Sequence, residues 1–366
     1  MDSNNYFVTG GTGFVGRFLI ERLLARGGRI YVLTRAASIA KIDKLRNLLN
    51  ASSEQLVAVV GDLSDARLGL SDADIDKLRG SIAHFFHVAA IYDLTASEEE
   101  QQLANVNGTR NAIDCAQALQ AGCFQHVSST AVSGMYSGTF REDMFEEAEN
   151  LNNAYFRTKH ASEAIVRKEC QVPWRIYRPS GILGHSASGE IDKIDGPYYS
   201  FPMIKKLRGL PSWLRLPGVN AGSLNLVPVD YVVDAMDHIA HQPDLDGGCF
   251  QLTNTRQYSA TEMTNIFAKV AGATPLSERI QLNPDKPPLR ELLTIKLLQR
   301  LGSRLVENAG LPIEAIKMMQ WDTQYDSTET QRALADSAIT LPDLEDYANV
   351  LWDFWEQHLD PERSAV

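Results

Sequence analysis

Apolar and polar residues follow a strand, helix, strand order at the start of the chain. Residues 6–8 form a short apolar run, residues 17–26 carry apolar side chains at helical spacing, and residues 29–33 form a second apolar run. Gly27 and Gly28 end the predicted helix of residues 17–26. This pattern predicts two parallel strands joined through a helix, with the right-handed crossover that such units adopt.

Similar patterns continue to about residue 255. Further strands are predicted at residues 56–60, 82–87, 124–127 and 247–253, and helices at residues 39–49, 105–119 and 230–239. Residues 225–229 are predicted to return the chain to the main sheet. Because strands alternate with helices, the predicted fold class is α/β, a doubly wound parallel sheet of Rossmann type with a smaller lobe.

The smaller lobe is predicted to be mostly helical and to bind substrate. Residues 184–222 have no clear period, and the last helix, residues 344–358, reads as docked core. We expect a main domain of residues 1–183 plus 223–258 and a substrate lobe of residues 184–222 plus 259–366. The apolar residues of 184–222 either line a channel for a hydrocarbon chain or form a small satellite core. The residues predicted for the channel are Tyr198, Tyr199, Met203 and Trp213.

Residues 286–306 form a basic amphipathic helix by pattern, in a chain that is acidic as a whole. Such a helix either contacts a membrane surface or packs as a lid with its cations in water. We favour the lid or packing helix, so peripheral membrane contact is not the preferred prediction.

A glycine turn lies between the first strand and its helix. Gly10, Gly13 and Gly16 lack side chains, so a pyrophosphate can approach the backbone and the helix can pack close to the strand. The helix N-terminus then faces that anion with unpaired N–H groups. The spacing and its context predict dinucleotide binding. The predicted contacts are Gly10, Gly11, Thr12, Gly13, Phe14, Val15 and Gly16.

The end of the second strand indicates which dinucleotide binds. An NAD site is expected to carry an acidic residue there, whereas this chain has Thr34 and Arg35, which suit a 2′-phosphate. The predicted cofactor is therefore NADP(H), with a solvated surface cation as the alternative for Arg35. Further cofactor contacts are predicted at Asp62, Leu63, Ala89 and Ala90, although Asp62 also suits a turn or N-cap.

Candidate chemistry appears at Tyr155 and Lys159. Residues four apart share one face of a helix, and an ammonium beside a phenol lowers the pKa of that phenol. Ser128, Ser129 and Thr130 follow a predicted strand and reach the same sheet edge. A phenol, a lysine and a hydroxyl beside a dinucleotide are suited to general acid catalysis.

Composition narrows the class of protein. The chain has 366 residues and a net charge of −11, which argues against nucleic-acid binding by the whole surface. The four cysteines are far apart and read as reduced, and no Cys or His cluster suggests a metal, so none is predicted. Neither a leader nor an apolar run long enough to span a membrane is seen, so a cytoplasmic location is expected.

Taken together, these motifs resemble the extended short-chain dehydrogenase/reductase family. The resemblance rests on the glycine turn, Asp62, the run 128–130 and Tyr155 with Lys159, and it continues through residues 177–179 and 225–230. It implies that Tyr155 is the general acid, that Lys159 activates it and binds the ribose, and that Pro179 contacts the cofactor. It also implies that Thr130, or failing that Ser129, holds the substrate oxygen. Asn105 resembles the family's helix asparagine, which implies that it supports the helix and a bound water rather than contacting substrate. Dimers are common among relatives, so a homodimer is an open expectation.

Residues 141–147, 196–199 and 351–356 are similar to the N-terminal reductase half of bacterial two-domain fatty acyl-CoA reductases. In those enzymes a second reductase domain follows, so this chain is either an excised domain or a stand-alone relative. The resemblance implies NADPH-dependent reduction of a long-chain fatty aldehyde to the alcohol. Reduction of an acyl-CoA or other acyl thioester and oxidoreduction of a hydroxysteroid are alternatives. Sugar-nucleotide epimerisation is less favoured, and an NADP-sensing binding protein is the non-enzymatic alternative.

Overall fold

The computed structural model describes residues 5–91, 96–192, 194, 196–211, 216, 218, 223–277 and 322–361. Contacts within the chain divide it into two units. The first comprises Met1–Ile182, Val227–Thr255 and Thr323–Leu341, and the second comprises Leu183–Leu226, Arg256–Asp322 and Pro342–Val366. Each unit is described separately below.

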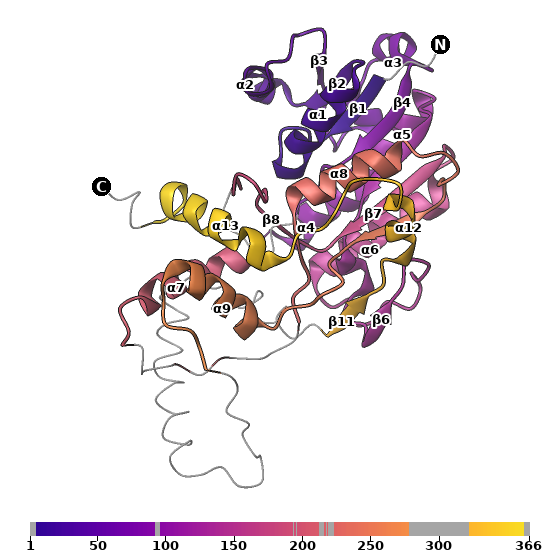
Figure 1. Ribbon diagram of the computed structural model, residues 1–366. Helices are drawn as coiled ribbons and strands as arrows, with labels where there is room; N and C mark the ends of the chain where they lie inside the picture. Colours follow the sequence, from indigo (N-terminus) through magenta and orange to yellow (C-terminus); the bar gives the residue numbers. More distant parts are fainter. Residues whose placement is uncertain are drawn as a thin grey trace. The chain divides into compact units, whose positions relative to one another are not determined.

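The first unit is built on a parallel seven-stranded sheet, as predicted (Figure 1). Its strand order is β10-β7-β5-β4-β1-β2-β3, so the order reverses between β1 and β4. A reversal of this kind leaves a crevice beyond the carboxyl ends of the two strands. The strands are β1 (Asn5–Thr9), β2 (Ile30–Thr34), β3 (Leu56–Val60), β4 (Ile82–His87), β5 (Cys123–Val127), β7 (Trp174–Pro179) and β10 (Cys249–Leu252).

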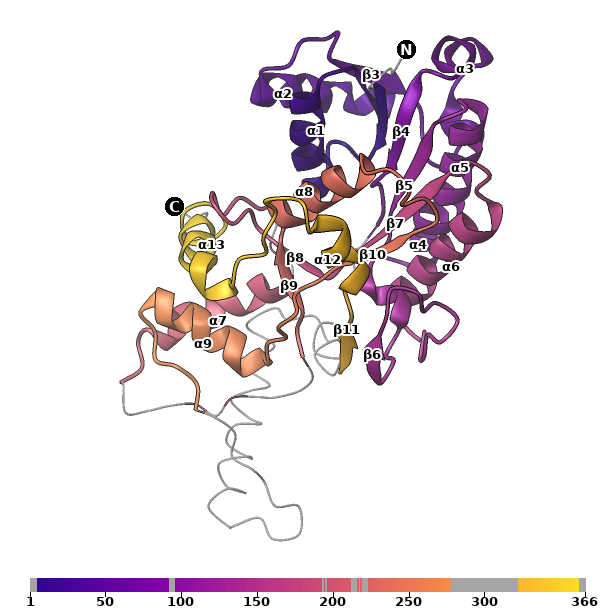
Figure 2. The same cartoon turned by 45° about the vertical axis from the view of Figure 1, so that its right-hand side comes forward.

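Helices cover both faces of this sheet (Figure 2). Tyr6 and Val8 of β1 pack into one apolar core with α1 (Phe14–Arg26), whereas Phe7 packs into a second core on the opposite face. Burial on both faces explains why the central strands read as continuous apolar runs. The first core also includes α2 (Ile39–Leu49) and α8 (Val229–Ala240), and the second includes α3 (Asp72–Leu78), α5 (Gly108–Ala118) and α6 (Ala154–Glu169).

A late segment of the chain returns to the first unit. β11 (Thr323–Tyr325) pairs in parallel with β6 (Gly138–Phe140), and α12 (Thr328–Leu334) follows it. The buried Glu142 carboxylate accepts hydrogen bonds from the backbone N–H groups of Gln251, Glu329 and Thr330. The assignment of all of residues 259–366 to the substrate lobe is therefore wrong for Thr323–Leu341, because these contacts join that segment to the sheet unit.

Two other local predictions need correction. β9 (Leu226–Pro228) was expected in the main sheet but pairs with β8 (Gly181–Leu183) in a separate two-stranded sheet. The helix predicted to open at Asn105 starts earlier, because α4 (Glu98–Gln101) runs through a π-helical turn (Gln102–Asn107) into α5. Ser97 and Glu100 form a capping box at the true start. Short 3₁₀ turns lie at Ala36–Ser38, Ala66–Gly69, Thr130–Ser133 (η4) and Gly196–Ser200 (η5).

The second unit has an aromatic core. Phe201 of α7 (Phe201–Leu207) lies 4.5 Å from Phe267 of α9 (Ala260–Ala271) between ring centroids. It lies 5.1 Å from Trp352 and 5.5 Å from Trp355, both on α13 (Leu344–His358). The prediction of a docked last helix is confirmed, with its bounds. Trp213 and the predicted basic helix 286–306 lie outside the described residues.

Candidate active site at the carboxyl edge of the sheet

The glycine turn brings the ends of β1 and β4 close together. Gly10 has a φ of +71°, in the left-handed region, and a Cβ there would lie 2.6 Å from the backbone nitrogen of Ala89. Any other residue at position 10 would be strained and would push the two strand ends apart. This contact lies where the strand order reverses, which is where open α/β sheets bind their ligands.

Gly16 and Gly13 differ in what a side chain would meet. A Cβ on Gly16 would collide with the carbonyl oxygen of Gly10, so this glycine lets α1 start directly against the turn. A Cβ on Gly13 would meet only that same oxygen, at 3.3 Å, among the described atoms. Gly13 is also the N-cap of α1, and within the described chain no side chain caps this helix. The uncapped N–H groups at the start of α1 fit a pyrophosphate, so these residues fit a dinucleotide.

The backbone of Ala89 is fixed by a buried hydrogen-bond chain. Its N–H donates to Thr9 Oγ1 at 3.3 Å, and Thr9 Oγ1 lies 2.8 Å from His87 Nδ1. His87 Nε2 lies 3.1 Å from Thr109 Oγ1, which itself donates to the Asn105 carbonyl oxygen at 2.6 Å. Since the Thr109 proton is used there, His87 must donate from Nε2 and accept at Nδ1. Burial lowers the pKa of His87 to about 3, so the ring stays neutral and keeps this tautomer.

The end of β2 places Arg35 near Asp62. Arg35 is exposed, and Thr34 is buried. The pKa of Asp62 lies below its ordinary value mainly because the Ser64 N–H donates to it, with a smaller effect from Arg35. Asp62 Oδ1 accepts from Ser64 N at 2.9 Å and from Ser64 Oγ at 2.8 Å. Asp62 therefore makes the turn contacts of its alternative interpretation, and its contact with a cofactor stays a prediction, as do those of Leu63 and Ala90.

Tyr155 and Lys159 lie one turn apart on α6. Tyr155 is half-buried, and the Lys159 Nζ donates to the carbonyl oxygen of Val127, the last residue of β5, at 3.0 Å. The ammonium has three donors, so this bond leaves others for a ligand. Burial lowers the pKa of Lys159 from 10.5 to about 8, although the Glu163 carboxylate acts in the opposite direction. The structure thus places Lys159 at the end of β5, with Tyr155 one turn before it on the same helix.

The three hydroxyls after β5 have different partners. Ser128 Oγ donates to Glu163 Oε2 at 2.7 Å, and Ser129 Oγ accepts from the Ala131 N–H at 3.1 Å. Thr130 begins η4, which packs against α6, and is 6% exposed. The hydroxyl run therefore lies beside the helix that carries Tyr155, but Ser128 and Ser129 already bond within the protein.

Asn105 connects the loop after β4 to α6. Its Oδ1 accepts from the Ile91 N–H at 2.8 Å, and its Nδ2 donates to the Ile91 carbonyl oxygen at 2.9 Å and to Thr158 Oγ1 at 3.2 Å. Thr158 Oγ1 also donates to the Tyr155 carbonyl oxygen at 3.2 Å. In this structure Asn105 supports the helix, which agrees with the expectation for this asparagine.

A buried ionic cluster behind the site was not recognised from the sequence. Glu163 is fully buried and accepts from Arg178 Nη2 at 2.6 Å, Arg167 Nη2 at 2.8 Å and Ser128 Oγ at 2.7 Å. Burial alone would raise its pKa, but the two guanidiniums and the Ser128 hydroxyl hold that pKa at about 2. Glu163 follows Lys159 by one helical turn, so the spacing was a usable signal for one of these contacts.

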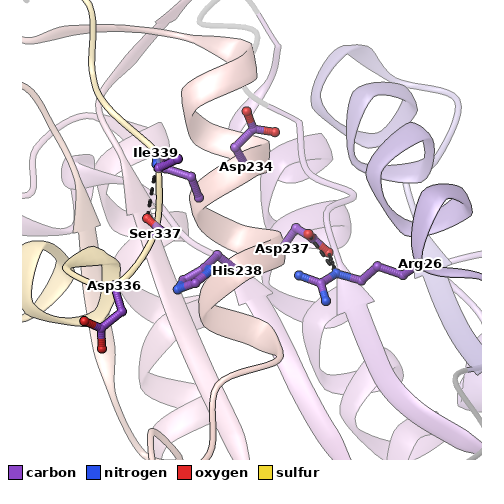
Figure 3. A pocket seen from close by; sticks show the side chains of 8 residues that line it. Arg26, Asp234, Asp237, His238, Asp336, Ser337 and Ile339 are labelled. Carbon is purple, nitrogen blue, oxygen red and sulfur yellow. Dashed lines mark hydrogen bonds and ion pairs between the residues drawn. The ribbon is translucent and has the colours of Figure 1, made fainter.

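A separate surface pocket does not belong to this site (Figure 3). It is lined by Arg26, Asp234, Asp237, His238 and the residues 336–339. Arg26 is the last residue of the 13-residue α1, whose first residue follows the glycine turn. At 1.5 Å per residue the pocket lies roughly 18 Å of helix away from that turn. Asp237 accepts from Arg26 Nε at 2.6 Å, so its charge is paired within the protein.

The predicted substrate residues lie in the second unit. Tyr198 is buried, its ring lies 4.8 Å from that of Phe201, and its hydroxyl accepts from the Gly184 N–H at 3.0 Å. Tyr198 thus takes part in the local core that was the alternative prediction. Tyr199 and Met203 are half-buried, and their contact with substrate stays a prediction.

The remaining expectations concern the cysteines, a metal site, membrane-spanning helices and Pro179. All four cysteines are unpaired, and no group of three or more metal-binding side chains is found in the described part of the chain. Within that same part, none of the helices is both long and apolar enough to cross a membrane. Pro179 ends β7 and is buried.

The strand order and the glycine turn define a dinucleotide-binding fold of Rossmann type. A family model described as male sterility protein, an NAD-binding family, matches residues 8–236. The chain belongs to this family. The predictions of class and fold from the sequence are confirmed.

Curated relatives agree with this assignment. The "Putative dihydroflavonol 4-reductase" of Synechocystis is 36% identical over 345 residues, which cover 90% of this chain and 89% of that protein. The aldehyde reductase lnbA of Aspergillus flavus is 28% identical over 334 residues, which cover 84% of this chain and 32% of that protein. The nonribosomal peptide synthetase FrzA of Cladobotryum is 26% identical, with 90% of this chain and 34% of that protein covered. The chain spans about a third or less of the first curated relatives.

Solved structures share the fold. The terminal R domain of the myxalamid PKS-NRPS pathway has a TM-score of 0.74 at 24% identity, covering 97% of this chain and 91% of that one. A thiolation-reductase di-domain from an archaeal nonribosomal peptide synthetase also has a TM-score of 0.74, at 17% identity, covering 98% and 76%. The chain is thus similar to an aldehyde reductase and to reductase domains of multidomain synthetases. Its family makes it an NAD(P)-dependent oxidoreductase of the extended short-chain dehydrogenase/reductase class.

Removing the Glu163 charge should destabilise the fold. Glu163→Gln leaves Arg178 buried without its counter-charge, and we expect a loss of about 3–5 kcal/mol in the free energy of unfolding, measured by urea denaturation. The pKa of Glu163 is about 2 in the fold against an ordinary 4.5, so its stabilisation is complete above pH 4.5 and is lost as pH falls toward 2. The variant should lose that acid dependence.

Glu169→Gln is the matched control on the same helix. Glu169 pairs with Arg110 at 2.9 Å on the surface, with 44% of its side chain exposed. The Glu169→Gln substitution should lower the free energy of unfolding by at most about 1 kcal/mol. If the two variants lost the same free energy of unfolding, the buried cluster would not stabilise the fold more than a surface ion pair does.

Substitutions of two glycines of the turn should affect cofactor binding and thermal stability separately. Gly13→Ala places a methyl group 3.3 Å from the Gly10 carbonyl oxygen on an extended backbone, a tight contact but not a collision. We therefore expect a nearly unchanged melting temperature and at least about tenfold weaker NAD(P)H binding by fluorescence titration. Gly16→Ala should lower the melting temperature, because its Cβ collides with the Gly10 carbonyl oxygen. Undiminished binding by Gly13→Ala would place the pyrophosphate elsewhere.

Proposed function

We propose that the protein is an NADPH-dependent carbonyl reductase that reduces a long-chain fatty aldehyde to the alcohol. The observation that carries the proposal is the arrangement around α6. Lys159 reaches the end of β5, Tyr155 lies one turn before it, and η4 packs against the same helix. β5, β1 and β4 are parallel strands of one sheet, so their carboxyl ends share an edge, which supports a phenol, an ammonium and a hydroxyl working beside the cofactor there.

Each side chain has a proposed role in proton transfer. Tyr155 donates its proton to the carbonyl oxygen of the aldehyde, and Thr130, or failing that Ser129, donates a hydrogen bond to that oxygen. The Lys159 ammonium lowers the pKa of the phenol and binds the ribose. The bound cofactor supplies the hydride that the carbonyl carbon receives. Because the pKa of Lys159 is about 8, this assistance weakens as pH rises above that value.

The preference for NADPH rests on the end of β2. Arg35 is exposed and follows Thr34 directly, so its guanidinium is available to a 2′-phosphate. Asp62 does not supply the acidic partner that NAD needs at β2, because it follows β3 and bonds to Ser64. These contacts favour the phosphorylated cofactor.

Reduction of an acyl thioester is the second candidate. The relatives named as nonribosomal peptide synthetases and the solved thiolation-reductase di-domain favour it, since a thiolation domain carries its substrate as a thioester. The aldehyde is preferred because of the similarity to aldehyde reductase lnbA and the apolar residues of 184–222. Following NADPH absorbance with decanal, decanoyl-CoA and a sterol ketone separates these activities. If NADPH is not oxidised with any of the three substrates, a cofactor-sensing protein would be favoured.

Tyr155→Phe should nearly abolish aldehyde reduction. Removal of the general acid is expected to lower turnover by about 10² to 10⁴ while NADPH binding is retained. Tyr31→Phe, in the middle of β2, is the control and should keep the wild-type rate. Full activity of Tyr155→Phe would remove this residue from the mechanism.

Arg35→Ala should weaken the preference for NADPH. Loss of a charge-assisted contact to the 2′-phosphate is expected to weaken NADPH binding by about ten- to a hundredfold and to leave NADH binding nearly unchanged. Arg79→Ala is the control, because Arg79 is an exposed arginine paired with Asp76 at 2.7 Å. An unchanged ratio of NADPH to NADH affinity would show that Arg35 does not select the cofactor.

A further inference from the structure

Two consecutive residues of α6 hold the chain on both sides of the candidate hydroxyls. Lys159 Nζ donates to the Val127 carbonyl oxygen at 3.0 Å, directly before the hydroxyl run 128–130. His160 Nδ1 lies 3.1 Å from the Val132 carbonyl oxygen, shortly after that run. The three hydroxyls therefore lie between two points that are bonded to the same helix. In the proposed reaction Lys159 acts on the phenol, whereas His160 has no assigned role.

The bond between His160 and Val132 has one possible direction. A carbonyl oxygen has no proton, so the imidazole Nδ1 must carry one and donate it. This requirement fixes the tautomer of the neutral His160 ring. A protonated ring also carries a proton on Nδ1, so the donor is present in both states of the side chain.

The Val132 carbonyl needs a donor from outside its own turn. Val132 is the third residue of η4, and carbonyl oxygens at the carboxyl end of a short helix lack partners within it. The preceding carbonyl, that of Ala131, accepts from the Gly134 N–H at 3.0 Å. Val132 is fully buried, so removal of the His160 donor would leave a carbonyl oxygen without that bond where water cannot readily replace it.

The His160 ring is held in place by Phe145. The two ring centroids are 4.1 Å apart, and the planes differ by 2°. Phe145 is buried, and the guanidinium carbon of Arg167 lies 4.9 Å from the centroid of its ring. Arg167 in turn donates to Glu163 at 2.8 Å. The imidazole is thus stacked in a fixed frame, as a side chain that orients a neighbouring segment must be.

The chain that follows η4 is fixed by a different contact. The Met135 N–H donates to the Glu149 carbonyl oxygen at 2.7 Å, and the Glu149 N–H donates to the Ser133 carbonyl oxygen at 3.1 Å. Gly134 has a φ of +61°, and a Cβ there would collide with the Glu149 carbonyl oxygen. These bonds join the end of η4 to the loop before α6, whereas the bond from His160 joins η4 to α6 itself.

We propose that His160 is a positioning residue that holds η4 against α6 and thereby sets the separation between the Tyr155 phenol and the hydroxyls of Ser129 and Thr130. The inference rests on the proposed function, in which the phenol and one of these hydroxyls bind the same carbonyl oxygen. Two groups that bind one oxygen must both be held within about 0.5 Å of the productive geometry. His160 itself does not touch the reacting atoms in this scheme.

Two substitutions of His160 separate its hydrogen bond from its stacking. His160→Phe keeps a ring against Phe145 and removes the donor, so we expect kcat for decanal reduction to fall about threefold to tenfold, the value of one hydrogen bond, with Kd for NADPH unchanged. His160→Asn loses the ring but places an amide N–H near the position of Nδ1, so its kcat should stay within about twofold of the wild type. Glu169→Gln, on the same helix, is the control and should keep the wild-type kcat.

The order of these variants decides the proposal. A wild-type kcat in His160→Phe, or a lower kcat in His160→Asn than in His160→Phe, would overturn it, because the hydrogen bond would then have no effect on turnover beyond that of ring packing. The melting temperature of each variant shows whether it folds.

A double-mutant cycle tests whether His160 acts through the hydroxyls. In a background that carries Ser129→Ala and Thr130→Val, His160→Phe should change kcat less than about twofold, because the groups that it positions are gone. The same loss of kcat in both backgrounds would contradict the proposal. Full activity of that background and of Tyr155→Phe would refute the proposed function itself. Loss of activity in both, with a wild-type kcat in His160→Phe, would refute only the positioning by His160.

Discussion

The buried carboxylate of Glu163 is the interaction on which the candidate site depends. It joins α6 to the end of β5 through Ser128 and to β7 through Arg178. A fully buried charge is tolerated only with partners that satisfy it, so the helix cannot shift along the sheet without breaking several bonds at once. Tyr155 and Lys159 are on this helix and are therefore held in place by the same carboxylate.

Glu163 also acts on the chemistry through charge. Lys159 is buried, and burial alone lowers the pKa of an amine, but the nearby carboxylate opposes that effect. Without Glu163 the amine would lose its proton more easily and would help a phenol less. On the cofactor side, the neutral His87 orders Thr9 and Ala89 by hydrogen bonds and adds no charge to the crevice. Glu163 thus stabilises the charged Lys159, and the neutral His87 separately orders the backbone at Ala89.

Much of this arrangement was predictable because its signals are local. The glycine turn, the strand Leu56–Val60 and the helices Ile39–Leu49 and Leu344–His358 follow from short-range periodicity, and the structure has the last three with the predicted bounds. The pairing of β9 with β8 and the return of β11 to β6 depend on contacts between distant segments. No local period encodes such pairings. Glu163 is an intermediate case, since its spacing from Lys159 is local but its partner Arg178 is not.

The three successive hydroxyls after β5 illustrate how tertiary contacts separate chemically similar residues. In the sequence, Ser128, Ser129 and Thr130 are nearly equivalent candidates. The Ser128 proton is used by Glu163, and Ser129 Oγ accepts from the Ala131 N–H. Thr130 begins η4, which packs against α6, the helix that carries Tyr155. A hydroxyl that only receives a hydrogen bond keeps its own proton for another acceptor. This argument excludes Ser128, whose proton goes to Glu163, and leaves Thr130 and Ser129 as the candidates proposed to hold the substrate oxygen.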